Sequence, residues 1–261
     1  MREFRYLIGF SLGSILAIVW VNQIKAADKP ADPLWQKAVA VAQSNENWVA
    51  GLTVMTVAVG HKGKTEGTYE SWSRSSPGNE GRINRETVKA IEDGKDVTER
   101  EKKKEAKARQ AEKNKTETKQ SGASPPGNPF DPEIQDRVFI TPLAPENARN
   151  IEGKPCAGYS FVVRNTNGPT ARGTAWLAKE TGTPVEIENM TIDPLPEKSL
   201  KAMAITTRYQ ITTNGAWRVA ETVTKSKVRV LLITIDLVTT NTYSEYWKNL
   251  SHEFTPARKS Q

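Results

Sequence analysis

The fold is decided by the stretch RGTAWLAKETGTPVEIE, residues 172–188. Two short runs with β-strand patterning, 172–177 and 183–188, flank a turn in which Gly182 can supply a positive φ. The stretch therefore predicts a β-hairpin. It is the clearest module of a longer series, because strand, turn and strand repeat from about Asp136 to Lys248.

Further strands are expected nearer the N-terminus. Asp32 and Pro33 suit the N-cap and first position of a helix over 33–43, and β-patterned runs follow at about 48–59, 67–75 and 82–91. Asn214-Gly215 is a further two-residue hairpin signal. We predict an α+β, mainly β fold. It is a curved antiparallel sheet or half-barrel of about nine to eleven strands, with the N-terminal helix covering the concave face.

The first residues have the order of a secretory signal peptide. A short basic start precedes the apolar run 7–21, and a small residue, Ala26, is available for cleavage. We therefore expect residues 1–26 to be removed and the protein to be periplasmic. The alternative is an uncleaved inner-membrane anchor, because about 18 apolar residues can just span a bilayer.

The basic charge is concentrated in one segment. The chain carries +7 overall, and residues 99–119 hold nine Lys or Arg against five Glu, which is +4. This segment predicts a charged, solvated helix that starts at a capping box near Thr98 and continues into a flexible loop to residue 129. It is interpreted as an insertion between strands. The alternative is contact with an anionic membrane surface or an acidic protein through Lys102–Lys119, and no nucleic acid is expected.

Catalytic and metal-binding signatures are absent from the sequence. Cys156 is the single cysteine, and His61 and His252 are the two histidines, so neither a disulfide nor a histidine-rich metal site can form. Outside the predicted signal segment no Gly-x-Ser-x-Gly motif is present, since the one match, residues 9–13, lies in its apolar run, and the chain has no His-Glu-x-x-His motif. We therefore expect a protein that is not an enzyme and that needs no cofactor or metal.

The order of signal, helix, three strands, helical insertion and long meander resembles the periplasmic outer-membrane lipoprotein-sorting superfamily. The matching residues are 172–177 with 181–184, Thr207-Arg208-Tyr209 and Gly215-Ala216-Trp217. The resemblance implies a lipoprotein-carrier-like half-barrel lined with apolar side chains and lidded by helices. The division that follows is 27–98 for the helix and first strands, 99–129 for the insertion, 130–250 for the meander that completes the same domain, and 251–261 for a polar tail.

Two functions are left open. One is the binding of a lipid acyl chain or a lipoprotein in an apolar cavity. The other is an envelope sensor or scaffold module that binds a protein partner and has a packed, ligand-free interior. The expected lining of the cavity is Tyr159, Phe161, Trp176, Val185, Ile187, Ile205, Tyr209 and Trp217. The alternative for each residue is simple packing against the helix at 33–43.

Overall fold

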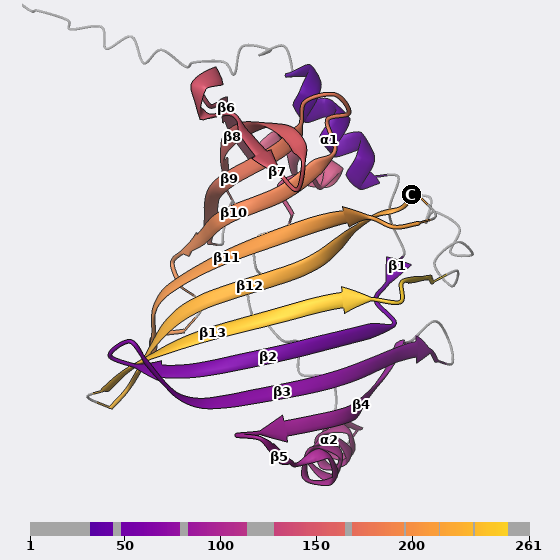
Figure 1. Ribbon diagram of the computed structural model, residues 1–261, viewed down its shortest axis with the longest axis vertical. Coiled ribbons are helices and arrows are strands. Elements are labelled where there is room, and N and C mark those ends of the chain that lie inside the picture. Colours follow the sequence, from indigo (N-terminus) through magenta and orange to yellow (C-terminus); the bar gives the residue numbers. More distant parts are fainter. Residues whose placement is uncertain are drawn as a thin grey trace, which may run out of the picture. The chain divides into compact units, whose positions relative to one another are not determined.

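The predicted hairpin forms the centre of one half of the sheet. Strands β9 (Thr170–Ala178) and β10 (Pro184–Asp193) pair antiparallel, and Gly182 between them has φ +74°. Its missing side chain serves a second purpose, because a Cβ there would lie 2.5 Å from Cβ of Lys37 in helix α1 (Pro33–Gln43). The turn residue thus permits both the hairpin and the seating of the helix (Figure 1).

The computed structural model describes residues 32–43, 48–78, 83–113, 128–164, 169–195, 197–213, 215–231 and 233–249, all within one unit that begins at Asp32. The predicted signal segment 1–26, the tail 251–261 and the second half of the charged segment lie outside these residues. The other elements are β1 (Trp48–Val49), β2 (Leu52–His61), β3 (Lys64–Pro77), β4 (Ile83–Glu92), β5 (Lys95–Asp96), α2 (Thr98–Lys113), η2 (Pro132–Arg137), β6 (Val138–Pro142), η3 (Pro145–Asn147), β7 (Arg149–Ile151), β8 (Lys154–Val163), β11 (Leu200–Ile211), β12 (Trp217–Val230), β13 (Ile233–Ser244) and β14 (Trp247–Lys248).

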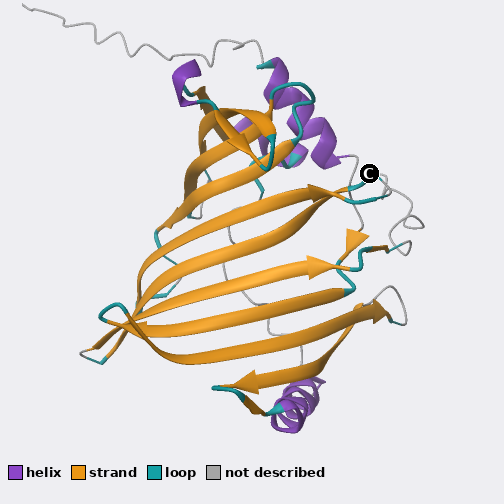
Figure 2. Ribbon diagram, in the orientation of Figure 1, coloured by secondary structure: helices purple, strands orange, loops and turns teal. Residues whose placement is uncertain are grey.

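These strands form one large, curved and open antiparallel sheet, as predicted (Figure 2). It has 12 strands in the order β5-β4-β3-β2-β13-β12-β11-β10-β9-β8-β6, with β7 paired to β8, while β1 and β14 make a separate pair. The count exceeds the expected nine to eleven because short strands such as β5 and β7 join it. Bulges at Asn189 and before Tyr209 interrupt the register, and bulges of this kind bend and twist strands.

The largest difference between chain order and sheet order is the pairing of β2 with β13. The N-terminal hairpin β2–β3 is joined to the last long strand, with Leu52 to Gly60 of β2 paired along β13 from Ser244 to Asp236. This pairing inserts the N-terminal strands beside the C-terminal ones, so that β4 and β5 form one edge of the sheet and β6 the other.

One row of paired residues crosses the sheet and defines what we call the inner face. Directly opposed residues on neighbouring antiparallel strands point to the same side, so the row shares one face. The row is Tyr159, Ala175, Ile187, Thr207, Thr222, Asn241, Met55, Ser71 and Ala90. The first three are buried, the middle four are half-buried, and the last two are buried again. The two ends of the inner face are therefore covered and its middle is not.

Helix α1 covers one end. Asp32 is its N-cap: Oδ1 accepts hydrogen bonds from the Leu34 amide at 2.9 Å and the Trp35 amide at 3.2 Å. The same oxygen accepts the Tyr159 hydroxyl at 2.9 Å, which ties the start of the helix to β8. Trp35 packs on Phe130, with ring centroids 4.9 Å apart. The sequence-based prediction of the helix and its cap is confirmed, and the helix covers only the β8–β11 part of the face.

Helix α2 covers the other end, and this differs from the expectation of a fully solvated insertion. Thr98 Oγ1 accepts the Ala90 amide at 2.9 Å, and Glu105 accepts hydrogen bonds from both the amide and the hydroxyl of Thr87. Arg109 donates to the Arg85 carbonyl. The helix has no apolar stripe, so apolar periodicity could not reveal this packing. Its polar side chains instead satisfy backbone groups of the edge strand β4.

Candidate functional site

The residues predicted to line a cavity separate into three groups. Tyr159, Phe161 and Ile187 are buried under α1, and Tyr209 and Trp217 lie at the border of the same cluster. Trp176 and Val185 belong to a different cluster with Cys156 and Ala178. Ile205 is half-buried in the uncovered middle. Contact of any of these eight side chains with a ligand stays a prediction.

Trp176 does not share the inner face with Tyr159. It is paired with Gly158, the neighbour of Tyr159, so its side chain points to the opposite side of the sheet. There its Nε1 donates to Glu188 at 3.0 Å, and the Arg149 guanidinium lies 4.4 Å from its ring centroid. Alternation along each strand does not show which residues of two strands share a face. The β8–β9 register, which pairs Tyr159 with Ala175, is needed to place Trp176 on the opposite side.

The uncovered middle of the inner face, which we call the open strip, lies on β11, β12, β13, β2 and β3. Its side chains are half-buried rather than buried, since neither described helix lies over them. The apolar members on this face include Met203, Ile205, Val228, Ile235, Leu237, Met55, Val57, Val59 and Tyr69. Only Ile205 was among the predicted lining, because β2 and β13 are not neighbours in the sequence.

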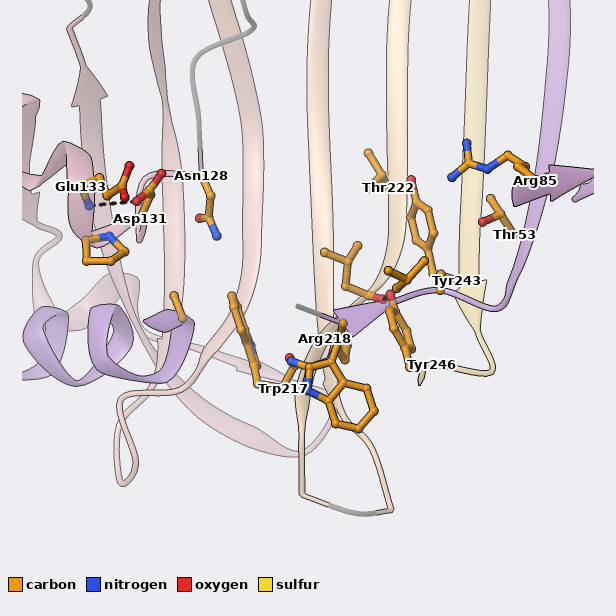
Figure 3. Close-up of a pocket in the computed structure, with 16 residues that line it drawn as sticks. Thr53, Arg85, Asn128, Asp131, Glu133, Trp217, Arg218, Thr222, Tyr243 and Tyr246 are labelled. Carbon is orange, nitrogen blue, oxygen red and sulfur yellow. Dashed lines mark hydrogen bonds between the residues drawn. The ribbon is translucent and has the colours of Figure 1, made fainter. Parts of the chain in front are cut away.

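A cavity of about 700 Å³ lies at the end of the open strip next to α1 (Figure 3). Trp217, Val219 and Thr222 of β12 contribute to its lining, together with Thr53 of β2 and Tyr243 of β13. The segment 131–133 and Arg85 border it from opposite sides, as Figure 3 shows. Aromatic, apolar and hydroxyl groups therefore meet in one space large enough for a small ligand or part of a larger one.

Several polar groups around this cavity are buried. Thr53 Oγ1 is enclosed and has no hydrogen-bond partner among the residues described. The Arg218 guanidinium lies over Trp48, 4.3 Å from the ring centroid. Burial lowers the pKa of Arg218 to about 10, so the side chain is still cationic at neutral pH. Burial also raises the pKa of Tyr246, whose hydroxyl donates to the Val219 carbonyl, to about 12.

A second cavity of about 340 Å³ adjoins the covered end. Val185, Tyr209, Ile211 and Trp217 line it together with the 178–181 turn. Tyr209 and Trp217 stack with ring centroids 4.4 Å apart, and Trp217 Nε1 donates to the Pro184 carbonyl at 2.8 Å. Trp217 thus stands between the two cavities, with its polar atom already bonded.

The titratable residues that the structure describes do not come together as a catalytic centre. Within the described ranges no three His, Cys, Asp or Glu side chains gather as a metal site. Cys156 is buried, and burial raises the pKa of its thiol, which is the opposite of what a nucleophile needs. His61 contacts the Thr234 carbonyl at 2.9 Å, while His252 lies outside the described residues. None of the helices in the described part of the chain is long and apolar enough to cross a membrane.

Comparison with known proteins finds similarity among solved structures. No family model matches the chain, and no curated protein does. An outer membrane lipoprotein-sorting protein domain from Vibrio parahaemolyticus aligns with TM-score 0.35 and 12% identity over 82% of this chain and 93% of that one. A LolA superfamily protein from Nitrosomonas europaea aligns with TM-score 0.33 and 10% identity over 82% and 90%. The MucA/MucB complex of Pseudomonas aeruginosa aligns with TM-score 0.21 and 9% identity over 81% and 93%.

Proposed function

We propose that this protein is an exported periplasmic protein that binds the acyl chain of a lipid or lipoprotein along the open strip. The observation that carries the proposal is the burial pattern of the inner face. The two helices cover the ends of the inner face and leave its middle uncovered. Apolar side chains there, such as Val57 and Leu237, are half-buried and form a continuous band. Apolar surface of this kind gains about 25 cal/mol per Å² when a ligand removes it from water.

The dimensions of the strip suit a single chain. From Tyr243 at the cavity to Ile235 the strand β13 advances eight residues, about 26 Å at roughly 3.3 Å per residue. A bilayer core of about 30 Å holds two acyl chains end to end, so one chain needs about 15 Å. A polar headgroup would then lie at the cavity, where Thr53 and Tyr243 offer hydroxyls.

The test compares two valines of one strand. Val57 points to the inner face and Val54 to the outer face, and both are half-buried on β2. Val57→Glu should abolish binding of a fluorescent fatty acid or lysophospholipid, while Val54→Glu should retain it. Lipid extracted from the purified wild type should be detectable by mass spectrometry, and added lysophospholipid at a hundredfold excess over Kd should stabilise the fold by about 2.7 kcal/mol.

A packed module that binds a protein is the second candidate. It is supported by the burial of Tyr159, Phe161 and Ile187, three of the eight expected lining residues, beneath α1. Ile205→Glu distinguishes the two functions, because Ile205 is half-buried and a charge there can still reach water in a carrier with an open cavity. Ile187, which is 3% exposed, would not distinguish them, because a charge there would be buried in either case. If Ile205→Glu unfolds the protein and the wild type carries no lipid, the carrier function is wrong and the module is preferred.

A further inference from the structure

The turn between β12 and β13 has an unusual composition. Three other tight turns of the described chain pair a polar residue with glycine, both at positive φ: Lys62-Gly63, Asp93-Gly94 and Glu152-Gly153. The β12–β13 turn has the sequence Leu231-Leu232, and Leu231 adopts φ +55°. A bulky apolar residue in the left-handed region is uncommon, because glycine or asparagine fits there without strain.

Two apolar side chains at this end of the hairpin, Leu231 and Ile233, are exposed. Leu231 is 90% exposed, and Ile233, the first residue of β13, is 54% exposed. Single exposed apolar residues are ordinary, but these two stand together at the end of a long hairpin. The row of apolar side chains extends from the tip along β13, because Ile233, Ile235 and Leu237 occupy alternate positions on the inner face. An apolar path therefore leads from the tip to the open strip.

Cationic side chains lie close to the tip, and those of β12 point to the face opposite to Ile233. The Arg229 amide donates to the Ser199 carbonyl at 2.8 Å, which holds the β10–β11 connection beside the hairpin. The exposed cations that these two segments bring together are Lys198, Lys201, Lys225, Lys227 and Arg229. The nearby carboxylates are Glu197 and Asp236, so positive charge is in excess. This positive surface is formed separately from the charged helix α2, which lies at the β4 edge.

We propose that the β12–β13 hairpin docks on an anionic lipid bilayer, with Leu231 and Ile233 entering the interface and the five cations contacting the headgroups. Apolar groups enter a membrane surface by about 5–10 Å. Arg229 lies two residues behind Leu231, about 7 Å along the strand at roughly 3.3 Å per residue, which is the level of the phosphates when the tip is inserted. The docking goes beyond acyl-chain binding and does not depend on it.

The test places an environment-sensitive dye on the tip of the full chain. Leu231→Cys provides the site, and Thr213→Cys, in the β11–β12 connection at the other end of β12, is the matched control. Cys156 is kept because it is buried. Wild-type protein treated with the same dye should stay unlabelled, which confirms that Cys156 does not react. The dye reports only its own surroundings. Residues 1–31 can therefore be kept in the protein that is tested, even if they bind lipid themselves. Lys103→Cys on α2 reports the competing surface.

With phosphatidylglycerol vesicles, the dye at position 231 should shift to the blue and be quenched by lipid-borne nitroxides, while the dye at 213 does neither. Binding should weaken at least tenfold on phosphatidylcholine vesicles and in Lys227→Glu/Arg229→Glu, since each cation contributes roughly fivefold. The proposal is overturned if position 231 shows no shift, if 213 shifts equally, if charge makes no difference, or if the α2 site shifts in its place.

Discussion

Asp32 anchors α1 at two points, and its removal should destabilise the protein by an amount that the structure allows us to work out. Its Oδ1 atom caps the helix through the Leu34 and Trp35 amides and accepts the Tyr159 hydroxyl. Loss of an N-cap costs about 1 kcal/mol. A stranded hydroxyl costs a further 1–3 kcal/mol, because Tyr159 is 4% exposed. Asp32→Ala should therefore lower the free energy of unfolding by about 2–4 kcal/mol.

Asp32→Asn is the matched control. Asparagine is as good an N-cap as aspartate and keeps an acceptor for Tyr159, so we expect a loss of only about 0.5–1 kcal/mol. Urea unfolding followed by tryptophan fluorescence measures both variants, with Trp35 beside the altered cap as the local reporter.

A double-mutant cycle isolates the contact between helix and sheet. Tyr159→Phe alone should cost about 1 kcal/mol, but in the Asp32→Ala background it should be neutral or stabilising, because it removes the stranded hydroxyl. A coupling energy below about 0.3 kcal/mol would refute the reasoning, since the two side chains would then act independently.

Four further predictions follow from other parts of the chain. Gly182→Ala should cost more than about 1 kcal/mol in thermal unfolding, because alanine is strained at φ +74° and meets Lys37 of α1; unchanged stability would contradict the seating of the helix. The free energy of unfolding should fall between about pH 10 and pH 12, because the folded pKa of Tyr246 is about 12 and lies above the unfolded value of about 10; a tyrosinate absorbance transition below pH 9 would argue against burial. Replacing 98–113 with a Gly-Ser linker should keep cooperative unfolding but promote aggregation measured by light scattering, because the β4 edge loses its hydrogen-bonded cover. Intact-mass analysis of protein from the native envelope should show a chain lacking about residues 1–26; a species that keeps Met1 would favour the anchor.

The sequence by itself was sufficient for features that depend on neighbours along the chain. The hairpin around Gly182 and the helix start at Asp32 were predicted because turn chemistry, capping and strand alternation act over a few residues. The weakly patterned strand at 82–91 was also identified, and it lies within one residue of β4 at each end. The curved antiparallel sheet could be expected because so many strands cannot stay flat and bury their apolar side chains.

Tertiary structure decided which of these strands meet and what covers them. The pairing of β2 with β13 joins residues about 180 positions apart, and no local pattern specifies such a partner. It creates the open strip, and it explains why Val57 and Leu237 were missing from the expected site. The position of Trp176 on the opposite face depends on a different pairing, the β8–β9 register. Burial of a side chain depends on the element packed over it, so the division between the core under α1 and the exposed strip became visible only when the register and both helices were in place.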